Sequence, residues 1–207
     1  MTTEPTTTSQ AILGLLALRP WTTYELAKQV QRSLGWFWPR TERKLYDEPK
    51  RLVAAGLATS KQEMTGARPR TVYGITARGR KALRAWLGAP PAPPSLEFEG
   101  LVKVFFADGG TLEQLRETLD RIAATSDERV AELADKFAQH ASGDIPFPER
   151  RALNTVALRF QYDHEQLIGD WARWARAQIA DWRSPTDCGR WDFHEAFPPS
   201  LGDAVIA

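Results

Sequence analysis

The fold is decided by residues 41–87, which read TERKLYDEPKRLVAAGLATSKQEMTGARPRTVYGITARGRKALRAWL. Thr41 is a natural helix N-cap, and Gly56 stands where the same helix would end. The apolar residues between them recur at helical spacing: Leu45, Pro49, Leu52 and Val53. The stretch therefore begins with a predicted helix that has one apolar face.

A hairpin is predicted after this helix. Residues 57–62 and 71–76 are short segments with β-branched and aromatic side chains, and Gly66 and Pro69 between them can turn the chain. Thr76 is then placed to cap a further helix. The predicted order is helix, strand, turn, strand, helix.

The face of the first helix that lies opposite its apolar residues is rich in hydrogen-bond donors. Its candidate DNA-binding residues are Thr41, Arg43, Lys44, Tyr46, Asp47, Lys50 and Arg51. We expect Arg43, Asp47 and Lys50 to contact base edges, because Arg and Lys can donate to guanine and Asp can accept from cytosine in the major groove. The candidates for contact with the DNA backbone are Lys44, Tyr46 and Arg51. An exposed basic helix face is more often simply solvated, so this face does not establish DNA binding by itself.

The hairpin strengthens the DNA-binding interpretation. Arg68 and Arg70 lie near its tip. A helix followed by a two-stranded ribbon with a cationic tip is the plan of a winged helix-turn-helix domain. In that plan the helix enters the major groove and the wing touches the DNA backbone or the minor groove.

Two further helices are predicted upstream. Residues 9–18 form an apolar helix that Ser9 can cap, and a second helix begins at Thr22 or Thr23. Tyr24, at the start of the second helix, could reach a phosphate with the help of the helix dipole, or it could pack against the domain instead.

Residues 9–88 resemble the PadR family of bacterial transcriptional regulators. The resemblance is carried by the segments AILGLLALRPWTTYELAKQVQ, ERKLYDEPKRLVAAGLATS and ARPRTVYGITARGRKALRAWL. The helical second half is similar to the larger subfamily that has a virulence-activator-like C-terminal domain. The resemblance implies a repressor, and regulators of this kind often respond to small planar compounds. Pro49 stands where the family pattern has leucine, so we expect a kinked recognition helix, because a helix-interior proline removes a backbone hydrogen bond.

Composition and charge support a protein of two domains. The 207 residues are 43% hydrophobic, and no apolar run approaches the roughly 20 residues that span a bilayer. The start lacks the basic segment of a signal peptide and Cys188 is the only cysteine, so we expect no membrane contact and a cytoplasmic location. Residues 1–88 hold 15 basic and 6 acidic side chains, a balance of +9, whereas residues 89–207 hold 12 and 20, a balance of −8. The basic half is therefore the half expected to bind DNA.

The predicted fold class is mainly α with a small β-wing. We expect a winged helix-turn-helix domain in residues 1–88, a proline-rich linker in residues 89–95, and a helical dimerisation domain in residues 96–207. In the helical domain, Ser95 is expected to cap a short helix and Thr111 a long one.

A last long helix is predicted from about Pro148 to Trp182. Its apolar stripe follows a strict heptad spacing through Leu153, Ala157, Phe160, His164, Leu167, Trp171 and Trp174. A helix of ~33 residues is roughly 50 Å long, which is more than a compact domain of this size can cover. We expect the preceding helix to cover one side and a second copy of the chain to cover the rest. The resulting homodimer would set two recognition helices about one DNA turn apart.

Four residues of this stripe are candidates for binding a small aromatic or otherwise planar effector: Phe160, His164, Trp171 and Trp174. A gap between helices there would offer ring faces and one imidazole to a ligand. Aromatic residues at heptad positions are more often part of a core, so packing alone is the competing interpretation. The loop that holds Trp36 and Trp38 is a second place where an effector could bind.

Two other classes of function were weighed against a DNA-binding regulator. The sequence contains no nucleophile elbow, phosphate-binding glycine loop or zinc-protease motif, and it predicts no metal site and no cofactor. An enzyme is therefore the least expected class. A winged-helix module that binds only proteins would need neither the basic first half nor the cationic wing.

Overall fold

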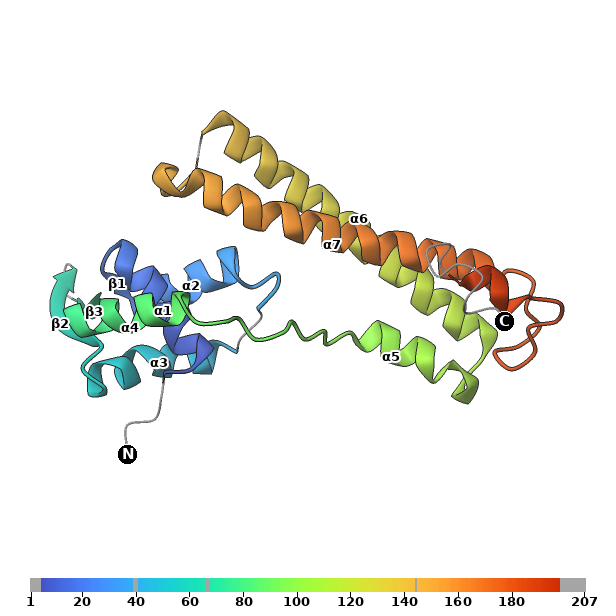
Figure 1. Ribbon diagram of the computed structural model, residues 1–207, viewed down its shortest axis with the longest axis horizontal. Helices are drawn as coiled ribbons and strands as arrows, with labels where there is room; N and C mark the ends of the chain where they lie inside the picture. The colour runs from blue at the N-terminus through green and yellow to red at the C-terminus, as the bar shows by residue number, and fades with distance from the viewer. Residues whose placement is uncertain (1–4, 39–40, 66–67, 144, 198–207) are drawn as a thin grey trace. The chain divides into compact units, whose positions relative to one another are not determined.

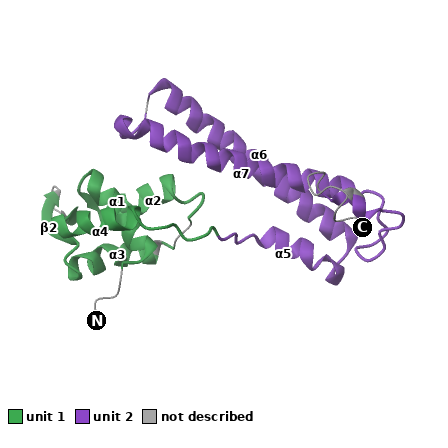
Figure 2. Ribbon diagram, viewed as in Figure 1, with its two compact units in different colours: residues 1–94 green, residues 95–207 purple. Residues whose placement is uncertain are grey.

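The computed structural model describes residues 5–38, 41–65, 68–143 and 145–197. The chain divides into two compact units, residues 1–94 and residues 95–207 (Figures 1 and 2). Each unit has its own buried residues.

The first unit is a winged helix-turn-helix domain, as predicted. Its elements in chain order are α1 (Thr7–Leu18), β1 (Trp21–Thr22), α2 (Thr23–Ser33), α3 (Glu42–Ala54), β2 (Ala58–Thr65), β3 (Arg68–Ile75) and α4 (Ala77–Leu87). The three strands form one antiparallel sheet in the order β1-β3-β2. Strand β1 was not predicted, because a pair of residues carries no readable alternation of apolar and polar side chains.

The core of this unit is built on α1. Ile12, Leu13 and Leu16 are almost completely buried, as are Leu26 of α2 and Leu45 of α3. The side chain of Trp21 is also buried, and its Nε1–H donates to the backbone oxygen of Leu15 at 2.8 Å. Helix α1 packs against α3, α4 and β3, and α2 packs against α3, so α3 lies between the other two helices in this core.

Some helices are capped by the predicted residues and others are not. Thr22 caps α2 in a reciprocal box with Glu25, and Thr76 caps α4. The cap of α1 is Thr6 and not Ser9, because Ser9 is the third helical residue and completes the capping box from inside. Thr41 does occupy the N-cap position of α3, but its side chain makes no capping hydrogen bond.

The second unit is helical. It contains α5 (Glu99–Phe105), a short 3-10 turn η1 (Ala107–Gly109), α6 (Leu112–Ser142), η2 (Pro148–Arg150), α7 (Arg151–Gln178) and η3 (Phe193–Ala196). Helices α6 and α7 lie side by side as an antiparallel hairpin (Figure 1), and α5 packs against α6. The capping box of Thr111 with Gln114 is confirmed. Ser95 is not the cap of α5, whose N-cap is Phe98.

The contact between α6 and α7 is made by small and polar side chains as well as apolar ones. The residues of α7 that are buried there are Leu158, Gln161, Glu165, Gly169 and Ala172. A Cβ atom at Gly169 would lie 2.8 Å from the hydroxyl of Ser126, so only glycine permits this approach of the two helices. Ser126 donates to the backbone oxygen of Glu165, whose carboxylate pairs with Arg129 at 2.9 Å.

Most of the predicted heptad stripe of α7 lies outside this contact, although Trp171 packs against the cluster of Leu115 and Leu119 from α6. The predicted residues Leu153, Phe160, Leu167 and Trp174 are between 44% and 66% exposed, and Trp171 is half-buried. Val156, which is not one of the predicted heptad positions, is 73% exposed on the same side of the helix. We call these six residues the outer stripe. At about 100° per residue, the outer stripe lies roughly 150° around the helix from the face that contacts α6.

Candidate nucleic-acid interface

Helix α3 presents a buried apolar face and an exposed charged face. Leu45, Pro49 and Leu52 point into the domain and are almost completely buried. The predicted DNA-binding side chains of α3 are all exposed: Thr41, Arg43, Lys44, Tyr46, Asp47, Lys50 and Arg51. Among the described residues, no ion pair holds Arg43, Lys44 or Lys50. These three cations are therefore available to a polyanion.

Pro49 does not interrupt α3. The helix runs without a break from Glu42 to Ala54, and the proline ring lies on its buried side. The missing N–H is thus on the face that packs against the domain, and the outer face keeps its helical spacing.

Glu48 anchors α3 to α1, which the sequence did not indicate. Its carboxylate is buried, although it belongs to the reading helix, and it accepts a hydrogen bond from the hydroxyl of Ser9. Arg51 pairs with the same carboxylate at 3.3 Å. A buried carboxylate requires such partners, so Glu48 fixes α3 and also restrains Arg51, one of the predicted backbone contacts.

Helix α2 carries two neighbouring polar side chains at its start. Tyr24 is exposed, as a phosphate contact requires, and the ammonium of Lys28 lies 5.1 Å from the centre of its ring. A hydrogen bond with Tyr24 raises the pKa of the exposed Lys28 ammonium. Lys28 was not predicted, but its spacing of four residues from Tyr24 places it on the same face of α2.

The start of α2 is also fixed electrostatically. Partial burial raises the pKa of Glu25, but hydrogen bonds from the backbone and hydroxyl of Thr22, together with the charge of Arg19, outweigh this effect, so the pKa is lowered. Arg19 lies 3.3 Å from the Glu25 carboxylate. The ionised carboxylate thus holds the end of α2 that carries Tyr24.

The wing places an acidic residue between its cations. Glu63 on β2 is directly opposite Arg70 on β3, and their side chains form an ion pair at 3.4 Å. Lys61 approaches the same carboxylate at 3.9 Å. The side chain of Arg68 lies outside the part of the chain that the structure describes, although its backbone pairs with that of Thr65. Glu63 was not predicted, because its role depends on the strand register.

Comparison with known proteins agrees with this geometry. Residues 12–85 match the family model described as the transcriptional regulator PadR-like family, and residues 99–180 match the model described as virulence activator alpha C-term. The chain thus carries a PadR-like domain followed by a virulence-activator-type C-terminal domain.

Two curated relatives support the assignment. The negative transcriptional regulator PadR of Bacillus subtilis is 30% identical over 98 residues, which are 46% of this chain and 54% of that protein. A probable transcriptional regulator of Mycobacterium tuberculosis is 31% identical over 84 residues, 40% of this chain and 44% of that protein. The chain thus spans about half the length of these two relatives. Both are named as regulators of transcription, in line with the interpretation that the chain is not an enzyme.

Solved structures show the same fold over most of the chain. Bacillus subtilis PadR in complex with operator DNA has a TM-score of 0.73 at 21% identity, covering 83% of this chain and 97% of that one. The same protein in complex with p-coumaric acid has a TM-score of 0.64 at 20% identity, with 82% and 93% coverage. The virulence activator AphA of Vibrio cholerae has a TM-score of 0.66 at 25% identity, with 84% and 98% coverage.

The four predicted effector residues lie in the virulence-activator-type C-terminal domain. Phe160 and His164 stack with nearly parallel rings whose centroids are 6.0 Å apart. Trp171 meets Phe98 edge to face at 6.1 Å, and Trp174 is exposed. All four lie away from the face of α7 that is buried against α6.

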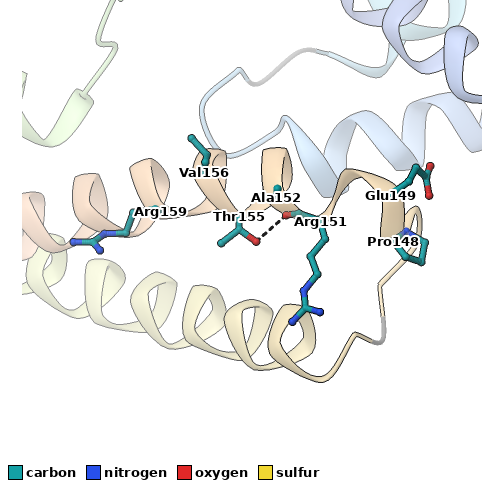
Figure 3. Close-up of a pocket in the computed structure, with 7 residues that line it drawn as sticks. All are labelled: Pro148, Glu149, Arg151, Ala152, Thr155, Val156 and Arg159. Carbon is teal, nitrogen blue, oxygen red and sulfur yellow. Dashed lines mark hydrogen bonds between the residues drawn. The ribbon is translucent and has the colours of Figure 1, made fainter.

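A hollow lies at the start of α7 in the same domain (Figure 3). It is lined by Pro148, Glu149, Arg151, Ala152, Thr155, Val156 and Arg159. The hydroxyl of Thr155 donates to the backbone oxygen of Arg151 at 2.8 Å. The hollow is open to solvent and contains none of the four predicted effector residues.

Two features are absent from the described residues. No group of three side chains there has the composition and geometry to hold a metal ion. Among the described helices, none is both long enough and apolar enough to cross a bilayer.

Proposed function

We propose that the chain is a dimeric, sequence-specific DNA-binding repressor of the cytoplasm. The observation that carries the proposal is the exposed face of α3, where Arg43 and Lys50 stand on a helix whose opposite side is buried. A rigid helix with outward donors can enter the major groove and read base edges.

The proposed contacts divide into two kinds. Arg43, Asp47 and Lys50 contact base edges, because they lie on the outermost part of α3. The residues proposed to contact the DNA backbone are Tyr24, Lys28, Thr41, Lys44, Tyr46, Arg51, Arg68 and Arg70. The net positive charge of residues 1–88 supplies the part of the DNA affinity that does not depend on base sequence.

The names of the relatives support repression and operator binding. The Bacillus subtilis protein is named a negative transcriptional regulator, and one of its structures contains operator DNA. Repression requires that the bound protein block transcription from a nearby promoter, and a dimer that covers two half-sites is suited to this.

We also propose a small aromatic effector that binds beside the outer stripe of α7. Phe160, His164, Trp171 and Trp174 offer ring faces and one imidazole, and the Bacillus subtilis relative forms a complex with p-coumaric acid. An effector can weaken DNA binding only if it prefers a dimer geometry that does not fit the operator.

The test of the proposed function uses DNA from the promoter next to the gene of this protein. Fluorescence anisotropy at several salt concentrations should show tight binding that weakens steeply as salt rises. Arg43→Ala with Lys50→Ala should abolish the preference for this DNA over a scrambled duplex, whereas Arg121→Ala in the second unit should not. An absence of binding to any duplex at low salt would favour the winged-helix module that binds only proteins.

Effector binding has a separate test. The intrinsic tryptophan fluorescence is titrated with a panel of planar aromatic acids, including p-coumaric acid. Saturable quenching is expected, and it should be lost in the Trp171→Phe and Trp174→Phe variants. Quenching that survives both changes would move the site to Trp36 and Trp38.

A further inference from the structure

Glu48 is a buried carboxylate on the helix that is proposed to read DNA. Its side chain is only 7% exposed, whereas the side chain of its partner Arg51 is 58% exposed. Both carboxylate oxygens are used: Oε1 accepts a hydrogen bond from the hydroxyl of Ser9, and Oε2 lies 3.3 Å from Nη1 of Arg51. Because a buried carboxylate that loses a partner is costly, these two contacts fix the position of Glu48.

The hydroxyl of Ser9 is itself held in place. It accepts a hydrogen bond from the backbone N–H of Thr6 at 2.9 Å, as part of the capping box of α1, and it donates to Glu48. Ser9 is as fully buried as Glu48. The first turn of α1 is thus connected through Glu48 to Arg51 on the exposed side of α3, although Ser9 and Glu48 are 39 residues apart in the chain.

Arg51 keeps most of its donors while it is bound to Glu48. Among the described residues, its guanidinium has a hydrogen-bond partner only in Glu48, which it contacts through Nη1. The N–H groups of Nε and Nη2 remain, and such a pair can bind a phosphate in bidentate fashion. At helical spacing, Arg51 lies one turn from Asp47 and two turns from Lys44, both of which are exposed. The arginine can therefore bind Glu48 and a phosphate at the same time.

The ion pair of the wing has a different character. The side chains of Glu63 and Arg70 are 36% and 48% exposed, and Glu63 is shared with Lys61. An exposed carboxylate can turn toward water, so it competes with phosphate for its cation. The buried carboxylate of Glu48 has no such alternative, and it stays beside Arg51 when a phosphate arrives. The two carboxylates should therefore have opposite effects on DNA affinity.

We propose that Glu48 is a positioning residue for DNA binding, which holds the guanidinium of Arg51 so that its Nε and Nη2 groups donate to a backbone phosphate. This inference rests on the DNA binding of the proposed function and adds how one of its backbone contacts is oriented. Glu48 itself does not touch the DNA. By holding Arg51 before binding, it removes part of the entropy cost of ordering a long side chain. An acidic residue thus increases the affinity for a polyanion.

Glu48→Gln tests this role through the direction of the change. Glutamine keeps the length of the side chain and an oxygen that can accept from Ser9, but it has no charge to hold Arg51. The affinity for the promoter duplex should fall about 3- to 30-fold, because Arg51 must then be ordered on binding. The loss should be equal on a scrambled duplex, since phosphate contacts do not depend on base sequence. Removal of a negative charge would by itself raise the affinity.

Glu63→Gln is the matched control. It removes the same charge from another carboxylate that pairs with an arginine proposed to contact the DNA backbone. Its affinity should rise, so the two variants should move in opposite directions. Fluorescence anisotropy with the same duplexes at one salt concentration measures both. A rise in affinity for Glu48→Gln would overturn the inference, because Glu48 would then act as a charge that competes with DNA.

A second comparison separates the positioning of Arg51 from a general effect on the fold. In an Arg51→Ala background, Glu48→Gln should change the DNA affinity by less than about 2-fold, because the arginine through which it acts is gone. An undiminished loss in this background would mean that Glu48 acts on the whole of α3, and the inference would be wrong. Thermal unfolding of each variant checks that it is folded.

Arg51→Lys leaves the buried carboxylate and its contact with Ser9 in place. Lysine keeps the positive charge but has no planar fork that can bind a carboxylate and a phosphate through separate nitrogens. Its DNA affinity should fall nearly as far as that of Arg51→Ala, and an affinity equal to that of the wild type would overturn the inference. Absence of DNA binding by the wild type would instead overturn the proposed function together with this inference.

Discussion

Helices α3 and α7 are both amphipathic, but they use their faces in opposite ways. Helix α3 buries Leu45 and Leu52 in its own domain and exposes cations. Helix α7 packs against α6 through Gln161, Glu165 and Gly169, and it exposes its most apolar stripe. An apolar helix face therefore predicts a contact with protein, but it does not tell whether the contacting residues belong to the same chain or to another one. The exposed side of α3 suits a polyanion, and that of α7 suits another protein.

The largest effect is expected from a charge in the outer stripe. Phe160→Asp places a carboxylate on the side of α7 that is expected to contact a second copy of the chain, where it would be buried without a partner. The dissociation constant of the dimer should rise at least about 100-fold. Light scattering at micromolar concentration should then give the mass of one chain.

The matched control for this change is Thr125→Asp. It adds the same charge at an exposed position of α6, between Arg121 and Arg129 at helical spacing. The control should remain dimeric. If Phe160→Asp were dimeric as well, the outer stripe of α7 would not be the dimer contact. The proposed contrast between the outer faces of α3 and α7 would then be wrong.

The next effect concerns the outer face of α3. Arg43→Ala should cost roughly 1–3 kcal/mol of DNA-binding free energy on the preferred sequence and relax the preference at one base position. Arg70→Ala should weaken binding to all sequences alike, because it is proposed to contact phosphate. Binding to a set of single-base operator variants measures both. An equal loss on every sequence for Arg43→Ala would make this residue a backbone contact.

A smaller effect of opposite sign is expected in the wing. Glu63→Gln removes the carboxylate that pairs with Arg70 and Lys61, so both cations become available to phosphate. Exposed ion pairs contribute little, and DNA affinity should therefore rise only about 2- to 10-fold at low salt. Glu128→Gln, which removes the same charge from α6, should leave the affinity unchanged. A loss of affinity in Glu63→Gln would show that the carboxylate orients Arg70 instead of competing with DNA.

The smallest effect is a pH dependence at the start of α2. The pKa of Glu25 is lowered in the folded protein, so its contribution to stability is present above the pKa of the unfolded chain and is lost as the pH falls through the folded value. The side chain is about one-third exposed, so we expect only about 0.5–1 kcal/mol.

Glu25→Gln provides the control, because glutamine can complete the same capping box without a charge. Thermal unfolding between neutral pH and pH 3 should show a smaller pH-dependent loss of stability in Glu25→Gln than in the wild type. Identical profiles would mean that the charge of Glu25 does not stabilise the fold.

Local sequence patterns were sufficient for most of the secondary structure. The capping signals of Thr22, Thr76 and Thr111 predicted where three helices begin, since each depends only on residues within one turn. They failed at Ser9, because Thr6 is an equally good cap, and at Ser95, because α5 begins only at Glu99 and its N-cap Phe98 makes no side-chain capping bond. The outward side chains of α3 were also predicted, because helical periodicity alone separates its two faces.

Long-range features of the site could not be predicted in this way. Glu48 looks like one more charged residue of α3, and only the packing of α1 on α3 shows that it is buried against Ser9. Glu63 and Arg70 are seven residues apart, and only the strand register makes them neighbours. Such pairings depend on the tertiary fold, which sequence periodicity does not encode.

The sequence by itself determined the winged helix-turn-helix plan, the charged face of α3 and the heptad stripe of α7, because each is a periodic pattern within one segment. Only the tertiary structure decided which face of α7 meets α6. The heptad stripe is the more apolar face, yet the close approach at Gly169 and the bonds of Ser126 and Arg129 to Glu165 hold the other face against α6. Packing within the protomer thus depends on shape and on satisfied polar groups, and it leaves the most apolar surface of the helix for a contact beyond the protomer.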